Sequence, residues 1–106
     1  MPPAKRVVWS PSATQDLWEI WRYYARVGSP EIADRILRDI AGASDALGER
    51  HNLGRKRDEI VKDLRSVNAQ AYTIFYRVRG APVEIIRVLH ERRDFPGSFL
   101  RRSQAE

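Results

Sequence analysis

The 106-residue chain contains no cysteine, and its apolar runs are only a few residues long. The missing thiols exclude disulfide frameworks, CxxC zinc sites and cysteine nucleophiles, and they suit a reducing compartment. The apolar runs are far shorter than the roughly 20 residues that a membrane-spanning helix needs, and the N-terminus carries no apolar signal core. We therefore expect a cytoplasmic protein that is neither secreted nor embedded in a membrane.

Motifs for cofactor or metal chemistry are equally scarce. The sequence has two histidines, and it has no glycine-rich phosphate loop, nucleophile elbow or carboxylate cluster. We expect no cofactor and no bound metal. The length suits a single domain, which we place at residues 1–102, with residues 103–106 as a disordered tail.

What the chain has in excess is positive charge. It carries 19 Lys and Arg residues against 14 Asp and Glu residues, with a formal net charge of +5 and a pI near 10.1. Residues 52–106 hold twelve basic and seven acidic residues, whereas residues 11–51 hold five basic and seven acidic ones. The second half therefore carries the excess, which favours an anionic partner such as nucleic acid, an acidic protein or the ribosome.

Two helices are predicted in the first half of the chain. Ser10-Pro11 and Ser29-Pro30 are helix-start signals, because the serine side chain accepts from a backbone N–H group and proline fits the first helical position. Apolar residues recur at helical spacing after each signal, and Gly28 is the expected end of the first helix. So short a connection predicts that the two helices fold back on each other as a hairpin.

The second half changes to the period-two pattern of β-strands. Residues 64–67, 72–78 and 83–89 are rich in β-branched and aromatic side chains, and residues 6–9 form a similar short run before the first helix. Residues 79–82 predict a tight turn and an antiparallel hairpin, whereas residues 48–59 are predicted as a loop. The fold class is therefore α+β, with an N-terminal strand and an α-helical hairpin packed on a small antiparallel β-sheet.

The strand pattern predicts a surface for a partner. Strict alternation places Arg87 and Leu89 on one face of the last strand, and Phe75 and Arg77 on one face of the strand before it. If one face of the sheet covers the helices, the other is an open, half-apolar surface that carries arginines. Each arginine taken singly also fits solvation or a pair with Glu84, whereas the cluster favours a function.

His90 is the one histidine with a candidate chemical role. It ends the last predicted strand, and Arg92 and Arg93 follow closely. A histidine in this setting can act as a general acid or base while arginines hold a phosphate. In the structural alternative, which residue types alone favour, the ring ends the strand and hydrogen-bonds a backbone carbonyl.

Several segments resemble the ParE toxins of the RelE/ParE superfamily. The pieces DLRSV, YTIFYRV and VEIIRVLHERRDF are similar to the C-terminal half of that family, and WSPSATQDLWEIWRYYA is similar to its first strand and helix. The resemblance covers nearly the whole chain, and RVLH is its most specific part. It implies a toxin of a type II toxin–antitoxin operon, bound by a ParD-type antitoxin whose C-terminal segment wraps around it.

The resemblance implies two possible targets. ParE-like members poison DNA gyrase, whereas RelE-like members cut messenger RNA in the ribosomal A site with arginines and often a tyrosine or histidine. Thr73 stands where RelE-type nucleases typically have an arginine, and Phe95 and Phe99 lack the phenol oxygen of their late tyrosine. The balance favours a non-enzymatic inhibitor of gyrase.

Two alternatives stay open. The first is a ribosome-dependent endoribonuclease in which His90 acts with Arg87, Arg92 and Arg93, and the second is a basic interaction module without toxicity. We expect no direct sequence-specific contact with nucleic acid. An acidic, amphipathic antitoxin tail would suit the basic surface of the toxin. The residues predicted to contact the target or the antitoxin are Arg77, Arg87, His90, Arg92, Arg93 and Phe95.

Overall fold

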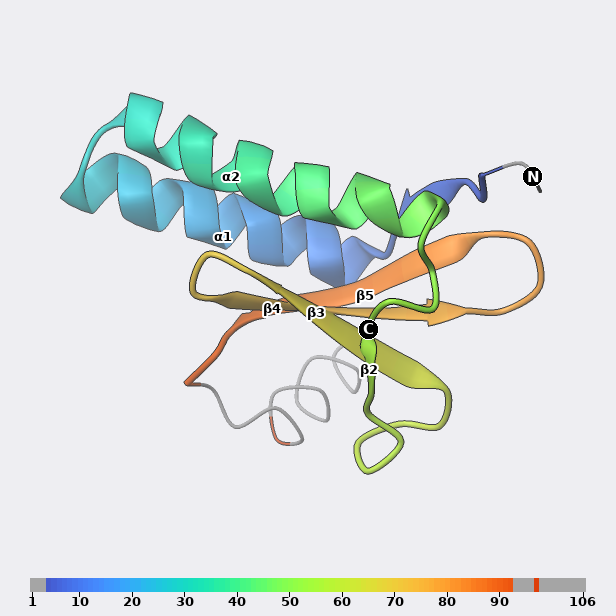
Figure 1. Ribbon diagram of the computed structural model, residues 1–106. Helices are drawn as coiled ribbons and strands as arrows, with labels where there is room; N and C mark the ends of the chain where they lie inside the picture. Colours follow the sequence, from blue (N-terminus) through green and yellow to red (C-terminus); the bar gives the residue numbers. More distant parts are fainter. Residues whose placement is uncertain (1–3, 93–96, 98–106) are drawn as a thin grey trace.

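The computed structural model describes residues 4–92 and residue 97 of the chain, so the predicted tail at 103–106 lies outside the described residues. Two helices lie side by side over one face of a β-sheet (Figure 1). The predicted α+β order of a strand, a helical hairpin and three long strands is confirmed. In chain order the elements are β1 (Val7–Trp9), α1 (Pro11–Val27), α2 (Pro30–Asp45), a 3₁₀ turn η1 (Ala46–Gly48), β2 (Arg55–Lys56), β3 (Leu64–Ala69), β4 (Tyr72–Val78) and β5 (Val83–His90).

Both helices begin at the predicted Ser-Pro signals. The Oγ of Ser10 accepts from the N–H group of Ala13 at 3.0 Å, and the Oγ of Ser29 accepts from that of Ile32 at 3.2 Å. A proline follows each capping serine at the start of the helix, where no hydrogen bond from its nitrogen is needed. Gly28 ends α1 as expected, and the short link that follows turns α2 back along α1.

The sheet is mixed rather than purely antiparallel. Its five strands have the order β1-β5-β4-β3-β2, and β1 runs parallel to β5, with Val7 opposite Val83. The other neighbouring strands are antiparallel. The expected antiparallel sheet is corrected here because most of the chain separates β1 from β5, and a long connection permits the parallel pairing that a tight turn cannot make.

The short strand β2 was not predicted. Arg55 pairs with Ser66 and Lys56 with Arg65, inside the segment that the sequence predicts as a loop. Two exposed charged residues carry no periodic pattern, so the pairing depends on contacts from elsewhere in the fold. One such contact is Tyr76, whose hydroxyl accepts from the N–H group of Gly54 at 2.8 Å.

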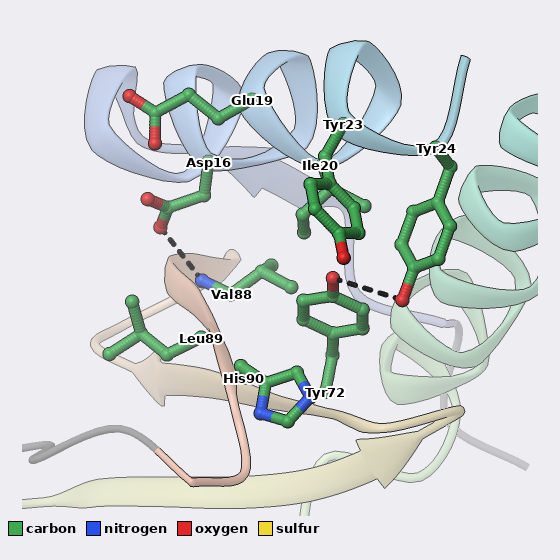
Figure 2. A pocket seen from close by; sticks show the side chains of 9 residues that line it. All are labelled: Asp16, Glu19, Ile20, Tyr23, Tyr24, Tyr72, Val88, Leu89 and His90. Carbon is green, nitrogen blue, oxygen red and sulfur yellow. Dashed lines mark hydrogen bonds between the residues drawn. The ribbon is translucent and has the colours of Figure 1, made fainter. Parts of the chain in front are cut away.

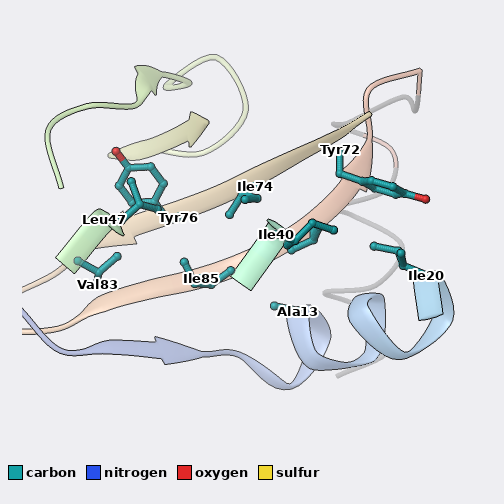
Figure 3. Packing of buried hydrophobic residues seen from close by; sticks show 10 residues of the cluster. Ala13, Ile20, Ile40, Leu47, Tyr72, Ile74, Tyr76, Val83 and Ile85 are labelled. Atoms are coloured by element: carbon teal, nitrogen blue, oxygen red, sulfur yellow. The ribbon is translucent and has the colours of Figure 1, made fainter. Parts of the chain in front are cut away.

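The main core fills the space between the helices and the sheet (Figure 3). Ile20 of α1 and Ile40 of α2 pack over Ile74 and Tyr76 of β4, which is the alternation predicted for that strand. All four are nearly inaccessible to solvent. This burial of apolar surface fixes the helical hairpin on one face of the sheet.

Strand β5 changes face part-way along its length. Ile86 has no partner in β4, because the register steps from Ile85 directly to Arg87. Val83 and Ile85 lie in the main core before this bulge, and Val88 lies in it afterwards. One extra residue reverses the alternation of all residues that follow, so the strict alternation predicted for β5 is wrong beyond Ile85.

The second face of the sheet is also buried. Phe75 is 0% exposed and Leu89 is 3% exposed, and both belong to a second apolar cluster with Leu64. Ile60 and Val61, from the loop before β3, pack against this cluster. The open, half-apolar face expected from the sequence is therefore wrong at Phe75 and Leu89.

Candidate functional site

Arg87, predicted to contact a partner, is buried. It is 2% exposed, and its Nε donates to Oδ2 of Asp16 at 2.7 Å while its Nη2 donates to Oδ1 at 3.0 Å. Such a two-pronged pair is the strongest geometry between a guanidinium and a carboxylate. The prediction that Arg87 lies on an exposed binding surface is therefore wrong, because a carboxylate on the helix that covers β5 holds it inside the fold.

Asp16 lies on the core-facing side of α1. It is three residues after Ala13 and four before Ile20, a spacing that puts all three on one side of the helix. Its Oδ2 also accepts from the N–H group of Val88 at 3.0 Å. Val88 lies beyond the part of β5 that pairs with β1, because the last pair of these two strands is Trp9 with Ile85. Asp16 was not predicted as a site residue, although a carboxylate at helical spacing within an apolar stripe is a signal for one that faces the core.

A pocket of about 380 Å³ lies beside the ion pair, between α1 and the end of β5 (Figure 2). The carboxyl groups of Asp16 and Glu19 lie on one side of the view, and the rings of Tyr23, Tyr24 and Tyr72 lie on the other. The hydroxyl of Tyr72 is 3.5 Å from that of Tyr24. A pocket whose wall combines aromatic rings with carboxyl and hydroxyl groups is suited to receive a side chain of a partner.

His90 lies at one end of this pocket. Its ring meets Tyr72 edge to face, with centroids 5.4 Å apart, and its Nδ1 accepts from the N–H group of Arg92 at 3.2 Å. The lone pair is then on Nδ1, and in the neutral ring the proton is on Nε2. In this tautomer Nε2 donates to a ligand and has no lone pair with which to accept a proton from one. The ring contacts a backbone amide rather than the expected carbonyl.

The other predicted residues are spread along the hairpin of β4 and β5. Arg77 is near the opposite end from His90, with its Nη2 4.0 Å from Oε1 of Glu84, so it forms the cross-strand pair that was one of the two alternatives. Arg92 is exposed directly after β5. The structure thus brings His90 and Arg92 together and separates Arg77 and Arg87 from them.

Two of the predicted contact residues, Arg93 and Phe95, lie outside the described residues. Within residues 4–92 and 97, no group of three or more His, Asp or Glu side chains could hold a metal ion. In the same part of the chain, no helix has the length and apolar character to cross a bilayer.

Comparison with known proteins identifies the family. The model for the ParE toxin of the type II toxin–antitoxin system parDE matches residues 7–95. The chain belongs to the ParE toxin family. This ParE toxin is 38% identical over 93 residues to Toxin ParE1 of Mycobacterium tuberculosis H37Rv, a match that covers 86% of this chain and 94% of the relative. It is 33% identical over 87 residues to Toxin RelE3 of Caulobacter vibrioides, covering 81% and 94% of the two chains.

A solved structure of a chromosomal ParDE toxin–antitoxin system from P. aeruginosa has the same fold as this ParE toxin. The TM-score is 0.73 at 25% sequence identity, and the match covers 82% of this chain and 96% of the other. The resemblance inferred from the sequence is confirmed. This ParE toxin is the toxic component of a ParDE type II toxin–antitoxin system.

Proposed function

We propose that this ParE toxin acts in the cytoplasm by binding DNA gyrase, without cutting nucleic acid, and that a ParD-type antitoxin neutralises it. The observation that carries the proposal is the buried pair of Arg87 and Asp16. A ribonuclease that used Arg87 would need its guanidinium against a phosphate, whereas two of its nitrogens already donate to a carboxylate. Arg87 is therefore not available to bind a phosphate, as the nuclease alternative with His90, Arg92 and Arg93 requires.

Two further residues favour binding over catalysis. His90 holds its lone pair against the N–H group of Arg92, which disfavours a role as general base. Thr73, which stands where RelE-type nucleases have an arginine, is 4% exposed, and its hydroxyl donates to Oδ1 of Asn68 at 3.0 Å. A buried threonine there cannot reach a substrate phosphate.

The helical hairpin supports an antitoxin partner. Tyr23 and Val27 of α1 are 50% and 57% exposed, and Ile32 of α2 is 41% exposed. Tyr23 also lines the pocket that ends at His90. An amphipathic antitoxin segment could cover these apolar side chains and continue into the pocket. The match to a ParDE system from P. aeruginosa supports the same partner.

The test compares the two targets with the purified toxin. In one arm, gyrase supercoils a relaxed plasmid, with a fluoroquinolone as the positive control for trapped cleavage. In the other arm, programmed ribosomes hold a labelled messenger RNA, with a RelE-type nuclease as the positive control. We expect supercoiling to stop, cleaved plasmid to accumulate and the RNA to stay intact. RNA cleavage with normal supercoiling would overturn the proposal in favour of the nuclease, and inactivity in both arms would favour the non-toxic interaction module.

A further inference from the structure

A second cavity lies at the other end of the β4–β5 hairpin from His90. Its volume is about 560 Å³. Lys5 before β1, Lys56 on β2 and Arg65 on β3 all line it, so that cations from three separate segments converge. The remaining lining residues are His51, Asn52, Asp58, Asp63, Leu64 and Val78.

The wall of this cavity is held in place by hydrogen bonds of Tyr76 and Arg65. The hydroxyl of Tyr76 accepts from the N–H group of Gly54 and donates to the carbonyl of His51, both at 2.8 Å. Arg65 Nη1 donates to the carbonyl of Gly54 at 2.8 Å and to that of Asn52 at 3.3 Å. The loop that carries His51 is therefore ordered by the protein itself, which lowers the cost of ordering it around a ligand.

His51, which lines the cavity, has a buried ring nitrogen. The Nδ1 of His51 is buried and has no hydrogen-bond partner among the residues that the structure describes. Buried nitrogens of this kind are normally paired with protein or with ordered water. Lys56, in contrast, is exposed at the cavity, so its ammonium group can contact the acceptor oxygens of a ligand.

The charge of this region is positive even after its acidic residues are included. One carboxylate oxygen of Asp58 accepts from the N–H group of Asp63 at 2.9 Å, a hydrogen bond within the loop between β2 and β3. An adjoining pocket shares Lys5 and adds Arg6, with no acidic residue in its lining. We call Lys5, Arg6, Lys56, Arg65 and His51 the basic end. Exposed arginines at positions 50, 55 and 79 are close in sequence to the linings of the two pockets.

We propose that the basic end binds the phosphodiester backbone of duplex DNA, without preference for a base sequence. Its cations are divided between two adjoining pockets, an arrangement that suits the repeated phosphates of a backbone better than a single carboxylate. Lysine and arginine supply point charges and hydrogen bonds to phosphate oxygens. This contact goes beyond gyrase binding, because it needs only the toxin and DNA.

The test measures DNA binding by the toxin alone. Two labelled duplexes of about 20 base pairs with unrelated sequences are titrated by fluorescence anisotropy between about 50 and 200 mM salt, where phosphate contacts lose affinity steeply. We expect equal affinity for both duplexes. In the double variant Lys5→Gln/Lys56→Gln, we expect about tenfold weaker binding and a salt slope smaller by about two.

The matched control is Arg35→Gln/Arg38→Gln, because both arginines are exposed on α2 and their loss changes the net charge equally. We expect at most about a twofold change there. An equal loss in both double variants, or no binding at the lowest salt, would overturn the inference. Tighter binding to polyglutamate than to DNA would overturn it in favour of an acidic protein partner.

Folding of each variant is checked by thermal melting, and Lys56→Gln alone, at an exposed position, provides a second variant in case the double one unfolds. For the single variant we expect a salt slope smaller by about one. An unchanged slope would count against the basic end. If the toxin binds DNA but gyrase supercoiling is unchanged, only the proposed gyrase inhibition is overturned. The failure of the DNA-binding proposal is therefore distinguishable from the failure of the gyrase proposal.

Discussion

The two ends of the sheet use their basic residues in opposite ways. Where α1 meets β5, Arg87 is 2% exposed and paired with Asp16. At the basic end, Arg6 and Lys56 are exposed to solvent. Arg6 and Arg87 both have β-branched neighbours in the sequence, whereas Lys56 lies between two arginines. What differs is the element that faces them, since only Arg87 meets a buried carboxylate. Whether a basic residue in or beside a strand is buried or exposed therefore depends on its tertiary neighbour rather than on its local sequence.

The substitution with the largest expected effect on this comparison is Asp16→Ala, which removes the carboxylate that pairs with Arg87. The substitution leaves the guanidinium of Arg87 buried without its main carboxylate and also removes the acceptor of the Val88 N–H group. We expect the free energy of unfolding to fall by about 3–5 kcal/mol. Urea denaturation followed by circular dichroism would measure it.

Two controls define the origin of that loss. Asp45→Ala removes an exposed carboxylate from the end of α2, and we expect a change within about 0.5 kcal/mol. The double variant Asp16→Leu/Arg87→Met removes both charges, and it should be more stable than Asp16→Ala because no unpaired charge is left inside. Equal stability of Asp16→Ala and Asp45→Ala would contradict the role given to the pair.

At the opposite end, Gly54→Ala tests the ordered loop. A β-carbon at this position would lie 2.5 Å from the hydroxyl of Tyr76 and 2.9 Å from the carbonyl oxygen of Ser66. We expect a loss of about 2–3 kcal/mol in unfolding free energy, because the loop must move away from the sheet. As the matched control, Gly42→Ala in α2 meets nothing within 4 Å and should stabilise by about 0.5–1 kcal/mol. A neutral Gly54→Ala would mean that the loop is not fixed.

A smaller effect is expected for Tyr76→Phe, which leaves Gly54 N–H and the His51 carbonyl without the hydroxyl. The cost should be about 1–2 kcal/mol near neutral pH. Burial raises the pKa of the Tyr76 phenol above its usual value of 10.0. The unfolded chain therefore loses this proton first, and the stability that depends on the neutral phenol declines as the pH rises above that value.

Denaturation curves at several values of pH would test this linkage. The wild-type protein should lose stability more steeply than Tyr76→Phe above pH 10.0. Parallel pH profiles for the two proteins would show that the phenol is equally acidic in the folded and unfolded chains, and would remove burial of Tyr76 as a source of the pH dependence.

Local signals predicted most of the fold. Ser10 and Ser29 cap their helices as expected, and the period of two in residues 72–78 places Ile74 and Tyr76 in the core. Such features depend on neighbouring residues in the chain, so a sequence contains them directly. The family resemblance came from the same segments, including RVLH at the end of β5.

The misses have a common physical origin in contacts between distant segments. The bulge at Ile86 depends on how β5 is paired with β4, and the burial of Arg87 depends on Asp16, which is 71 residues away in the chain. The strand β2 pairs only because the fold brings it beside β3. In the candidate site, His90 and Arg92 could be placed from sequence order. The spacing of Asp16 predicts only that it faces the core, and neither its pairing with Arg87 nor the place of Tyr72 follows from local sequence.

The carboxylate of Asp16 has a consequence for self-association. β1 covers β5 only as far as Ile85, so the N–H group of Val88 would otherwise be available to a strand of another molecule. Exposed groups of this kind invite pairing between chains and aggregation. Asp16, together with the Ser10 hydroxyl that donates to the carbonyl of Ile86 at 2.7 Å, closes this part of the edge in place of a longer strand. Any protein that extended the sheet here would first have to displace a buried ion pair.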